Sequence, residues 1–100
     1  MKVKAKIKNG VVHVKAMAKH DMTTYNQAEK RTGNKDDANF ITHINATCNG
    51  EQILDMSTSQ FLSKNPIFKF RFRGAKAGDT VKMDWVDRKG KTGKGKGKIK

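Results

Sequence analysis

Apolar and cationic residues alternate strictly over residues 67–73, in the run Ile-Phe-Lys-Phe-Arg-Phe-Arg. Side chains on a β-strand point to opposite faces with a period of two, so Phe68, Phe70 and Phe72 share one face and the cations share the other. A helix scatters such rings around its axis, whereas a strand buries them all, at roughly 1.5–3 kcal/mol for each ring. The pattern predicts a central strand of a sheet with one buried face.

The same period of two recurs along most of the chain and stops at turn sequences. We expect further strands at residues 2–8, 11–19, 40–49, 51–56, 81–85 and 91–99. Asn-Gly pairs at residues 9–10 and 49–50 suit tight hairpins, because both residue types tolerate a positive φ. The lysines on the outer face of residues 2–8 are typical of an edge strand. In the strand at 40–49, Phe40 is expected to point inward and Ile41 outward.

Some seven short strands without a convincing helix predict an all-β domain, either a β-sandwich or a small barrel. The sandwich fits better, because the apolar positions supply two inner faces. The predicted core consists of Val12, Val14, Ile44, Ala46, Cys48, Phe68, Phe70, Phe72, Val81, Met83 and Trp85. The 100 residues are expected to form a single antiparallel β-sandwich domain.

Two segments lack the alternating pattern. Residues 20–39 are polar and without period, which predicts an exposed loop with at most a helical turn near residues 21–25. A loop of this length in a small domain is more often functional or mobile than idle. Residues 57–66 are expected to connect two strands, with Phe61 and Leu62 covering the end of the core.

The chain is strongly basic, with 22 lysines and arginines against 9 acids and a net charge of +13. Such a balance indicates an anionic partner: nucleic acid, a lipid surface, an acidic protein or a small anion. Residues 87–100 alone hold seven cations and one acid. Their lysine-glycine alternation suits either a strand with its charge on one side or a disordered basic tail, and we favour a solvated edge or frayed tail over a phosphate-binding segment.

Reactive chemistry is sparse. Cys48 is the single cysteine, which excludes an internal disulfide, and its parity places it in the core, where a thiol stays protonated and inert. The histidines, His13, His20 and His43, lack the spacing of metal ligands. Gly-Lys-Thr at residues 90–92 resembles the end of a phosphate-binding loop, but Trp85 stands where that motif needs glycine. We therefore expect no metal, no cofactor and no enzyme acting alone.

We expect no targeting segment in this chain. The longest apolar run is far shorter than the roughly 20 residues that a membrane helix needs. The first residues lead into no apolar signal-peptide segment. The pattern is typical of a chain without membrane segments or an export signal of its own.

Several short motifs, in this order, resemble the SoxZ family, one half of the SoxYZ sulfur-carrier complex of bacterial thiosulfate oxidation. They are His20-Asp21-Met22, Cys48-Asn49-Gly50, the stretch from Asn65-Pro66 to Arg73, Gly78-Asp79-Thr80 and Trp85-Val86-Asp87 ahead of a lysine-rich last strand. The family tends to carry a proline where this chain has Asp21, and the lysine-glycine segment is more basic than expected.

This resemblance implies an immunoglobulin-like sandwich that forms a heterodimer with SoxY, whose glycine-rich arm carries the sulfur on a cysteine. It also implies a periplasmic complex exported with a partner that bears the signal, and transient docking to other Sox enzymes. A homodimer of the isolated chain stays open.

Our hypothesis is a non-catalytic subunit that pairs with SoxY through apolar surface. The segment His20, Asp21, Met22 is the expected partner contact. The expected electrostatic surface consists of Lys69, Arg71, Arg73, Lys94, Lys96 and Lys98. The alternative is a small basic β-domain that binds single-stranded nucleic acid. It is disfavoured because parity puts the phenylalanine rings opposite the cations, and such proteins need rings beside their cations.

Overall fold

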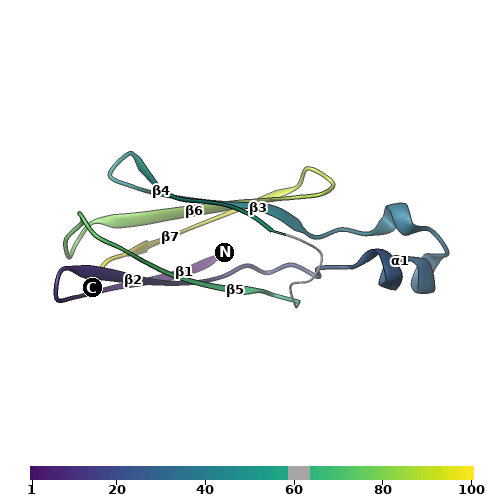
Figure 1. Ribbon diagram of the computed structural model, residues 1–100, viewed down its shortest axis with the longest axis horizontal. Helices are drawn as coiled ribbons and strands as arrows, with labels where there is room; N and C mark the ends of the chain where they lie inside the picture. Colours follow the sequence, from purple (N-terminus) through teal and green to yellow (C-terminus); the bar gives the residue numbers. More distant parts are fainter. Residues whose placement is uncertain (59–63) are drawn as a thin grey trace.

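Two antiparallel sheets pack face to face in this computed structural model, which describes residues 1–58 and 64–100 (Figure 1). The first sheet has the spatial order β1 (Lys2–Lys8), β2 (Val11–Met17), β5 (Ile67–Phe72). The second has the order β4 (Glu51–Ser57), β3 (Ile41–Cys48), β6 (Thr80–Asp87), β7 (Thr92–Lys98). The predicted all-β sandwich is confirmed. The predicted positions of Phe61 and Leu62 fall outside the described residues.

Alternate residues along the strands are buried between the two sheets. Val12 and Val14 on β2 and Val81 and Met83 on β6 are at most 2% exposed. The outward residues between them, His13 on β2 and Lys82 on β6, are exposed. Each large apolar side chain removed from water contributes roughly 1.5–3 kcal/mol, so these inward rows hold the two sheets together.

The phenylalanine strand β5 lies at the edge of its sheet, so its predicted central position is wrong. Among the described residues it pairs with β2 alone. The rings have the expected parity, but only Phe68 is buried, while Phe70 and Phe72 are half-buried with ring centroids 6.3 Å apart. An edge strand has one neighbour fewer, and its inward side chains are therefore covered less completely.

A bulge changes the parity at the start of β3. The register against β6 shifts between Ile41 and His43, so one extra residue stands on the β3 side. Consequently Phe40 and Ile41 are both buried, at 8% and 0% exposure. The prediction that Ile41 points outward is wrong for this reason.

Residues 20–39 contain a helix that the sequence analysis did not predict. Helix α1 (Tyr25–Thr32) and the 3-10 turn η1 (Lys35–Asp37) project beyond the end of the sheets (Figure 1). Thr24 caps α1 by accepting a hydrogen bond from the Gln27 backbone N–H, and the Gln27 side chain accepts one from the Thr24 N–H. Gly33, at φ 75°, ends the helix in the left-handed conformation. Since α1 buries only Ala28, it has no apolar period to reveal it.

The lysine-glycine segment is an ordered strand rather than a frayed tail. β7 lies beside β1, and beyond it Lys100 donates its backbone N–H to the Ala5 carbonyl at 3.1 Å and accepts one from Ile7 at 3.1 Å. A Cβ placed on Gly95 lies 2.2 Å from the Met1 carbonyl oxygen, and one on Gly97 lies 2.4 Å from that of Val3. Strand alternation points Gly95 and Gly97 inward, where the β1 backbone leaves no room for a side chain, so only glycine fits there. The lysines between the glycines face solvent.

Replacing Gly97 by alanine tests this close approach. The added methyl must displace backbone, so Gly97→Ala is expected to lower the free energy of unfolding by about 3 kcal/mol. Urea unfolding measures it. Lys96→Ala, one residue earlier on the outward face, is the control and should change stability by less than about 0.5 kcal/mol. Equal unfolding midpoints for Gly97→Ala and the unchanged chain contradict the packing of β7 on β1.

Candidate functional site

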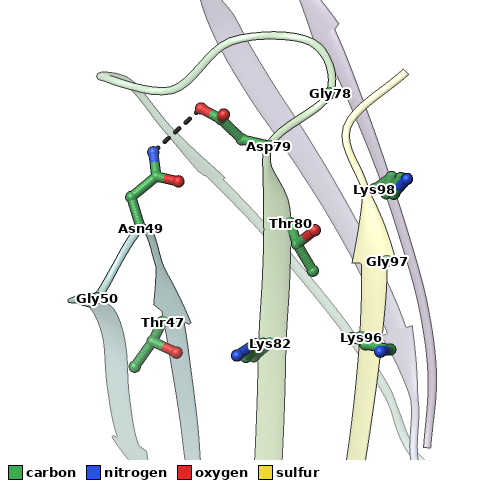
Figure 2. A pocket seen from close by; sticks show the side chains of 10 residues that line it. All are labelled: Thr47, Asn49, Gly50, Gly78, Asp79, Thr80, Lys82, Lys96, Gly97 and Lys98. Atoms are coloured by element: carbon green, nitrogen blue, oxygen red, sulfur yellow. Dashed lines mark hydrogen bonds between the residues drawn. The ribbon is translucent and has the colours of Figure 1, made fainter.

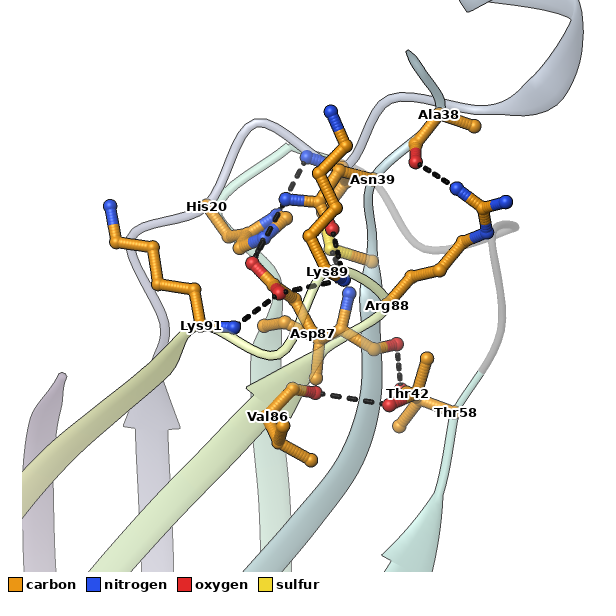
Figure 3. A network of polar contacts seen from close by, with 12 residues as sticks. His20, Ala38, Asn39, Thr42, Thr58, Val86, Asp87, Arg88, Lys89 and Lys91 are labelled. Atoms are coloured by element: carbon orange, nitrogen blue, oxygen red, sulfur yellow. Dashed lines mark hydrogen bonds and ion pairs between the residues drawn. The ribbon is translucent and has the colours of Figure 1, made fainter. Parts of the chain in front are cut away.

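His20 lies in a polar network at the end of the sandwich from which α1 projects (Figure 3). Its Nε2 is 3.0 Å from Oδ2 of Asp87, and its ring meets that of Trp85 edge-on, with centroids 5.2 Å apart. Nδ1 accepts a hydrogen bond from the Met22 backbone N–H at 2.9 Å. Because Nδ1 is an acceptor, Nε2 carries the proton and donates to the carboxylate.

The Asp87 carboxylate is the centre of this network. Its side chain is fully buried, and it also accepts hydrogen bonds from the Asn39 amide at 2.9 Å and from the backbone N–H groups of Lys89 and Lys91 at 3.1 and 2.8 Å (Figure 3). Burial is the largest single influence on its pKa and acts to raise it. The hydrogen bonds from His20, Asn39 and Lys91 outweigh burial and lower the pKa of Asp87 below its ordinary value.

Arg88 extends the network to α1. Its guanidinium donates to the carbonyl oxygens of Asp36 and Ala38 at 3.0 and 2.9 Å, and it lies over the Tyr25 ring at 5.3 Å from the centroid. The β6–β7 turn thus holds the 20–39 segment from both ends. This arrangement is a structural clasp, since His20 and Asn39 bind Asp87, and Arg88 binds the backbone of the 20–39 segment.

The three residues expected to contact the partner occupy different environments. Met22 is 3% exposed and its sulfur accepts a hydrogen bond from the Ile41 N–H at 3.3 Å, so it belongs to the core. The His20 side chain is 7% exposed within the network. Asp21 alone presents an exposed side chain, 3.8 Å from Lys64. Partner contact by this segment stays a prediction, with Asp21 as its accessible member.

The cleft beside the network is not selective for one sign of charge. It encloses about 560 Å³. Four lysines and three aspartates are among its lining residues. The lining of this cleft therefore mixes positive and negative charges, which does not favour the binding of an anion.

Cys48 ends β3 at the opposite end of the sandwich and is 5% exposed. Burial raises the pKa of its thiol, and the negative charges of Asp79 and Glu51 raise it further. The thiol is therefore protonated at neutral pH and shielded from reagents. The predicted packed core thiol is confirmed.

An open groove of about 680 Å³ crosses the outer face of the second sheet near this end (Figure 2). Lys82 on β6 and Lys96 and Lys98 on β7 line it, and Lys82 is the direct cross-strand partner of Lys96. Asp79 lies at its end, where hydrogen bonds from the Asn49 amide and the Lys76 N–H, both 3.0 Å, lower the pKa of the carboxyl. The groove carries an excess of positive charge and is open to solvent.

The six cations of the expected electrostatic surface do not lie together. Lys69 and Arg71 are on the outer face of the first sheet, and Arg73 directly follows β5. Lys94, Lys96 and Lys98 are on the outer face of the second sheet. The structure therefore has two cationic surfaces on opposite sides of the sandwich.

No metal-binding arrangement is present in the part of the chain that the structure describes, because no three His, Cys, Asp or Glu side chains gather there. Within the same residues, no helix is long and apolar enough to cross a membrane.

The sequence analysis missed the central role of the Asp87 carboxylate and named this residue only as part of the motif Trp85-Val86-Asp87. Asp87 accepts a hydrogen bond from the Lys89 N–H two residues later, as aspartates that begin a turn commonly do. An aspartate followed by a glycine-containing turn was visible in the sequence. The pairing with His20, 67 positions away, was not. Lys82 was likewise overlooked because it stands alone in the sequence between apolar residues.

Comparison with known proteins gives one family. The family model described as Sulphur oxidation protein SoxZ matches residues 1–98 of the chain. No curated protein matches it.

Asp87→Asn tests the network. The amide cannot accept all the hydrogen bonds of the carboxylate, so the free energy of unfolding is expected to fall by about 3 kcal/mol at pH 7. Because the folded-state pKa of Asp87 is lowered, its stabilisation is present above the unfolded value of about 3.9 and is lost as pH falls through the folded value.

The stability gap between Asp87→Asn and the unchanged chain should therefore narrow below about pH 4, as followed by urea unfolding across a pH series. Asp21→Asn, at an exposed carboxylate, is the matched control and should leave stability within about 0.5 kcal/mol. A gap that stays constant down to pH 2 argues against an ionised Asp87.

Proposed function

The chain belongs to the SoxZ family of sulphur oxidation proteins, and from this premise we propose that it is the non-catalytic subunit of a periplasmic SoxYZ carrier complex. In this proposal it pairs with SoxY, which carries the sulfur intermediates covalently during thiosulfate oxidation, and the two are exported together. Family membership assigns the chain to the Sox sulfur-oxidation system. The partner, the compartment and the division of labour are our inference.

The state of Cys48 carries this proposal. A covalent sulfur carrier needs an accessible sulfur that forms a thiolate near neutral pH. Cys48 is the single cysteine of the chain, is 5% exposed and has a raised pKa. A member of a sulfur-oxidation family with no usable thiol supports the view that the carrier cysteine resides on another subunit.

The sandwich offers a pairing surface on the side away from the β1–β7 contact. There the edge strands β4 and β5 have no further strand paired to them among the described residues. Leu54 and Met56 on β4 and Phe70 and Phe72 on β5 have inward parity but are only half-buried. Partly covered apolar side chains beside unpaired strand edges favour association with another chain. We assign this side, defined by those four residues, as the SoxY-facing side.

Thiol labelling tests the state of Cys48. In the folded chain at pH 7.5, alkylation by iodoacetamide is expected to be at least about 100-fold slower than in urea, because the reaction requires an opening of the structure. Mass spectrometry follows it. Since the Cys48→Ala variant keeps the pairing surface, it should still form the complex with SoxY. Rapid labelling of the folded chain, or a requirement for Cys48 in sulfur loading, contradicts the proposal.

Sedimentation of the chain mixed with SoxY tests the pairing. A heterodimer is expected at micromolar concentration, and the variant Leu54→Ser with Phe72→Ser should weaken it at least tenfold, about 1.4 kcal/mol. Met17→Ser, which removes an exposed apolar side chain on the other sheet face, is the control and should leave the affinity unchanged.

Melting curves confirm that each variant is folded. Two proteins that stay separate overturn the SoxY pairing. A heterodimer unaffected by the double variant overturns the assigned side only.

A further inference from the structure

The outer face of the first sheet carries positive charge and no negative charge. Its outward positions on β1, β2 and β5 alternate with the buried ones, and a cation occupies most of them. We define the cationic face by its charged members: Lys2, Lys4, Lys6, Lys8, Lys15, Lys69, Arg71 and Arg73. No aspartate or glutamate occurs in any of the three strands.

Strand register places these cations directly opposite one another. Lys15 is the cross-strand partner of Lys4 on one side and of Lys69 on the other, so three ammonium groups form a row across the sheet. The next row consists of Lys6, His13 and Arg71. Like charges at directly opposed positions destabilise a sheet. This arrangement of cations therefore does not stabilise the isolated domain.

The rest of the chain does not compensate these charges. Among the described residues, the ion pairs involve other cations: His20, Lys35, His43, Lys64 and Arg88. All nine acids lie in the 20–39 segment or between residues 51 and 87 outside β5. The cationic face is thus left to solvent and counterions.

Two exposed apolar side chains adjoin the cationic face. Met17 and Ile67 are cross-strand partners in the row of Lys2, and among the described residues they are the large apolar side chains with the highest exposure, 40% and 53%. An apolar contact beside charged residues is the usual composition of a protein interface, in which a desolvated anchor gives affinity and charge gives rate and orientation.

We propose that the cationic face, together with Met17 and Ile67, docks the acidic surface of a second protein that visits the SoxYZ complex. The inference rests on the proposed function, because it takes the visitor from the Sox enzymes that act on the carrier. The face is a sheet's outer surface, away from the SoxY-facing side at Leu54, Met56, Phe70 and Phe72. Strand β5 belongs to both surfaces, since Phe70 and Phe72 point inward from it and Lys69 points outward, so pairing with SoxY at this edge leaves the cations of β1 and β2 free.

Other polyanions fit this face less well. Single-stranded nucleic acid requires stacking rings among the cations. In the part of the chain that the structure describes, the cationic face offers no aromatic ring except the imidazole of His13, because Phe68, Phe70 and Phe72 point inward. A lipid surface is attracted by positive charge of any arrangement, so it does not require the fixed cross-strand rows of cations. Membership in a multi-protein oxidation system favours a protein.

The central lysine gives a signature that a structural role does not produce. Lys15→Glu converts two repulsive cross-strand pairs into attractive ones, so the melting temperature should rise by a few degrees. The same variant should bind the visiting enzyme less tightly. A residue kept for stability shows the opposite behaviour, with both quantities falling on replacement.

The decisive experiment titrates the SoxYZ complex against each purified Sox enzyme, at low and at physiological salt. The face variant combines Lys4→Glu, Lys15→Glu and Lys69→Glu. The control variant combines Lys82→Glu, Lys94→Glu and Lys96→Glu, which makes the same change of charge on the opposite sheet. At low salt the face variant should bind one enzyme at least about tenfold more weakly, the control should change binding less than threefold, and salt should reduce the difference.

Sedimentation of both variants with SoxY is measured first, so a failure of pairing is recognised separately. An intact complex whose two variants lose enzyme binding equally overturns the docking face, because net charge then suffices. An intact complex that binds no Sox enzyme also overturns it. If only an oligonucleotide or phosphatidylglycerol vesicles bind the face, the partner is a nucleic acid or a membrane and the proposal is wrong.

Discussion

The close approach of β7 to β1 is the contact on which the whole sandwich depends. Because Gly95 and Gly97 have no side chain, the β7 backbone reaches the carbonyl groups of Met1 and Val3. Lys100 then adds backbone hydrogen bonds to Ala5 and Ile7 of β1, and Ile99 enters the core at 2% exposure. The sandwich is thus closed on one side by backbone, and on the other side Leu54 and Met56 of β4 and Phe70 and Phe72 of β5 are left partly covered. The same alternation sends every lysine of β7 outward.

Periodicity in the sequence was sufficient for the fold class and for most inward positions. Parity reports which face a side chain takes, and Val12, Val81 and Trp85 are buried as expected. It does not report how many neighbours a strand has, so the position of β5 in its sheet was wrong. It also fails at a bulge, which is why Ile41 was placed outside. Helix α1 was missed because its stability comes from caps and from Arg88 rather than from an apolar stripe.

The candidate sites also differ in whether the sequence could predict them. The inert state of Cys48 follows from strand parity and could be predicted. The clasp of His20 and Asp87 could not, since it joins a loop to a strand end 67 residues later and only the folded chain brings them together. The cationic face was anticipated in part, from Lys69, Arg71 and Arg73. Its rows required the register of three strands, two of which come from the other end of the sequence.

The contact between β1 and β7 also bears on how the molecule is made. The first strand finds its neighbour on that side only in residues 92–100, so the contact joins segments separated by nearly the entire length of the domain. During synthesis β1 can pair with β2 at once, but its other flank stays bare until the ribosome has released the last strand. Closure is therefore a late event of high contact order, and a slow one compared with hairpin formation. Until then the free flank of β1 is an exposed strand edge that other chains can pair with.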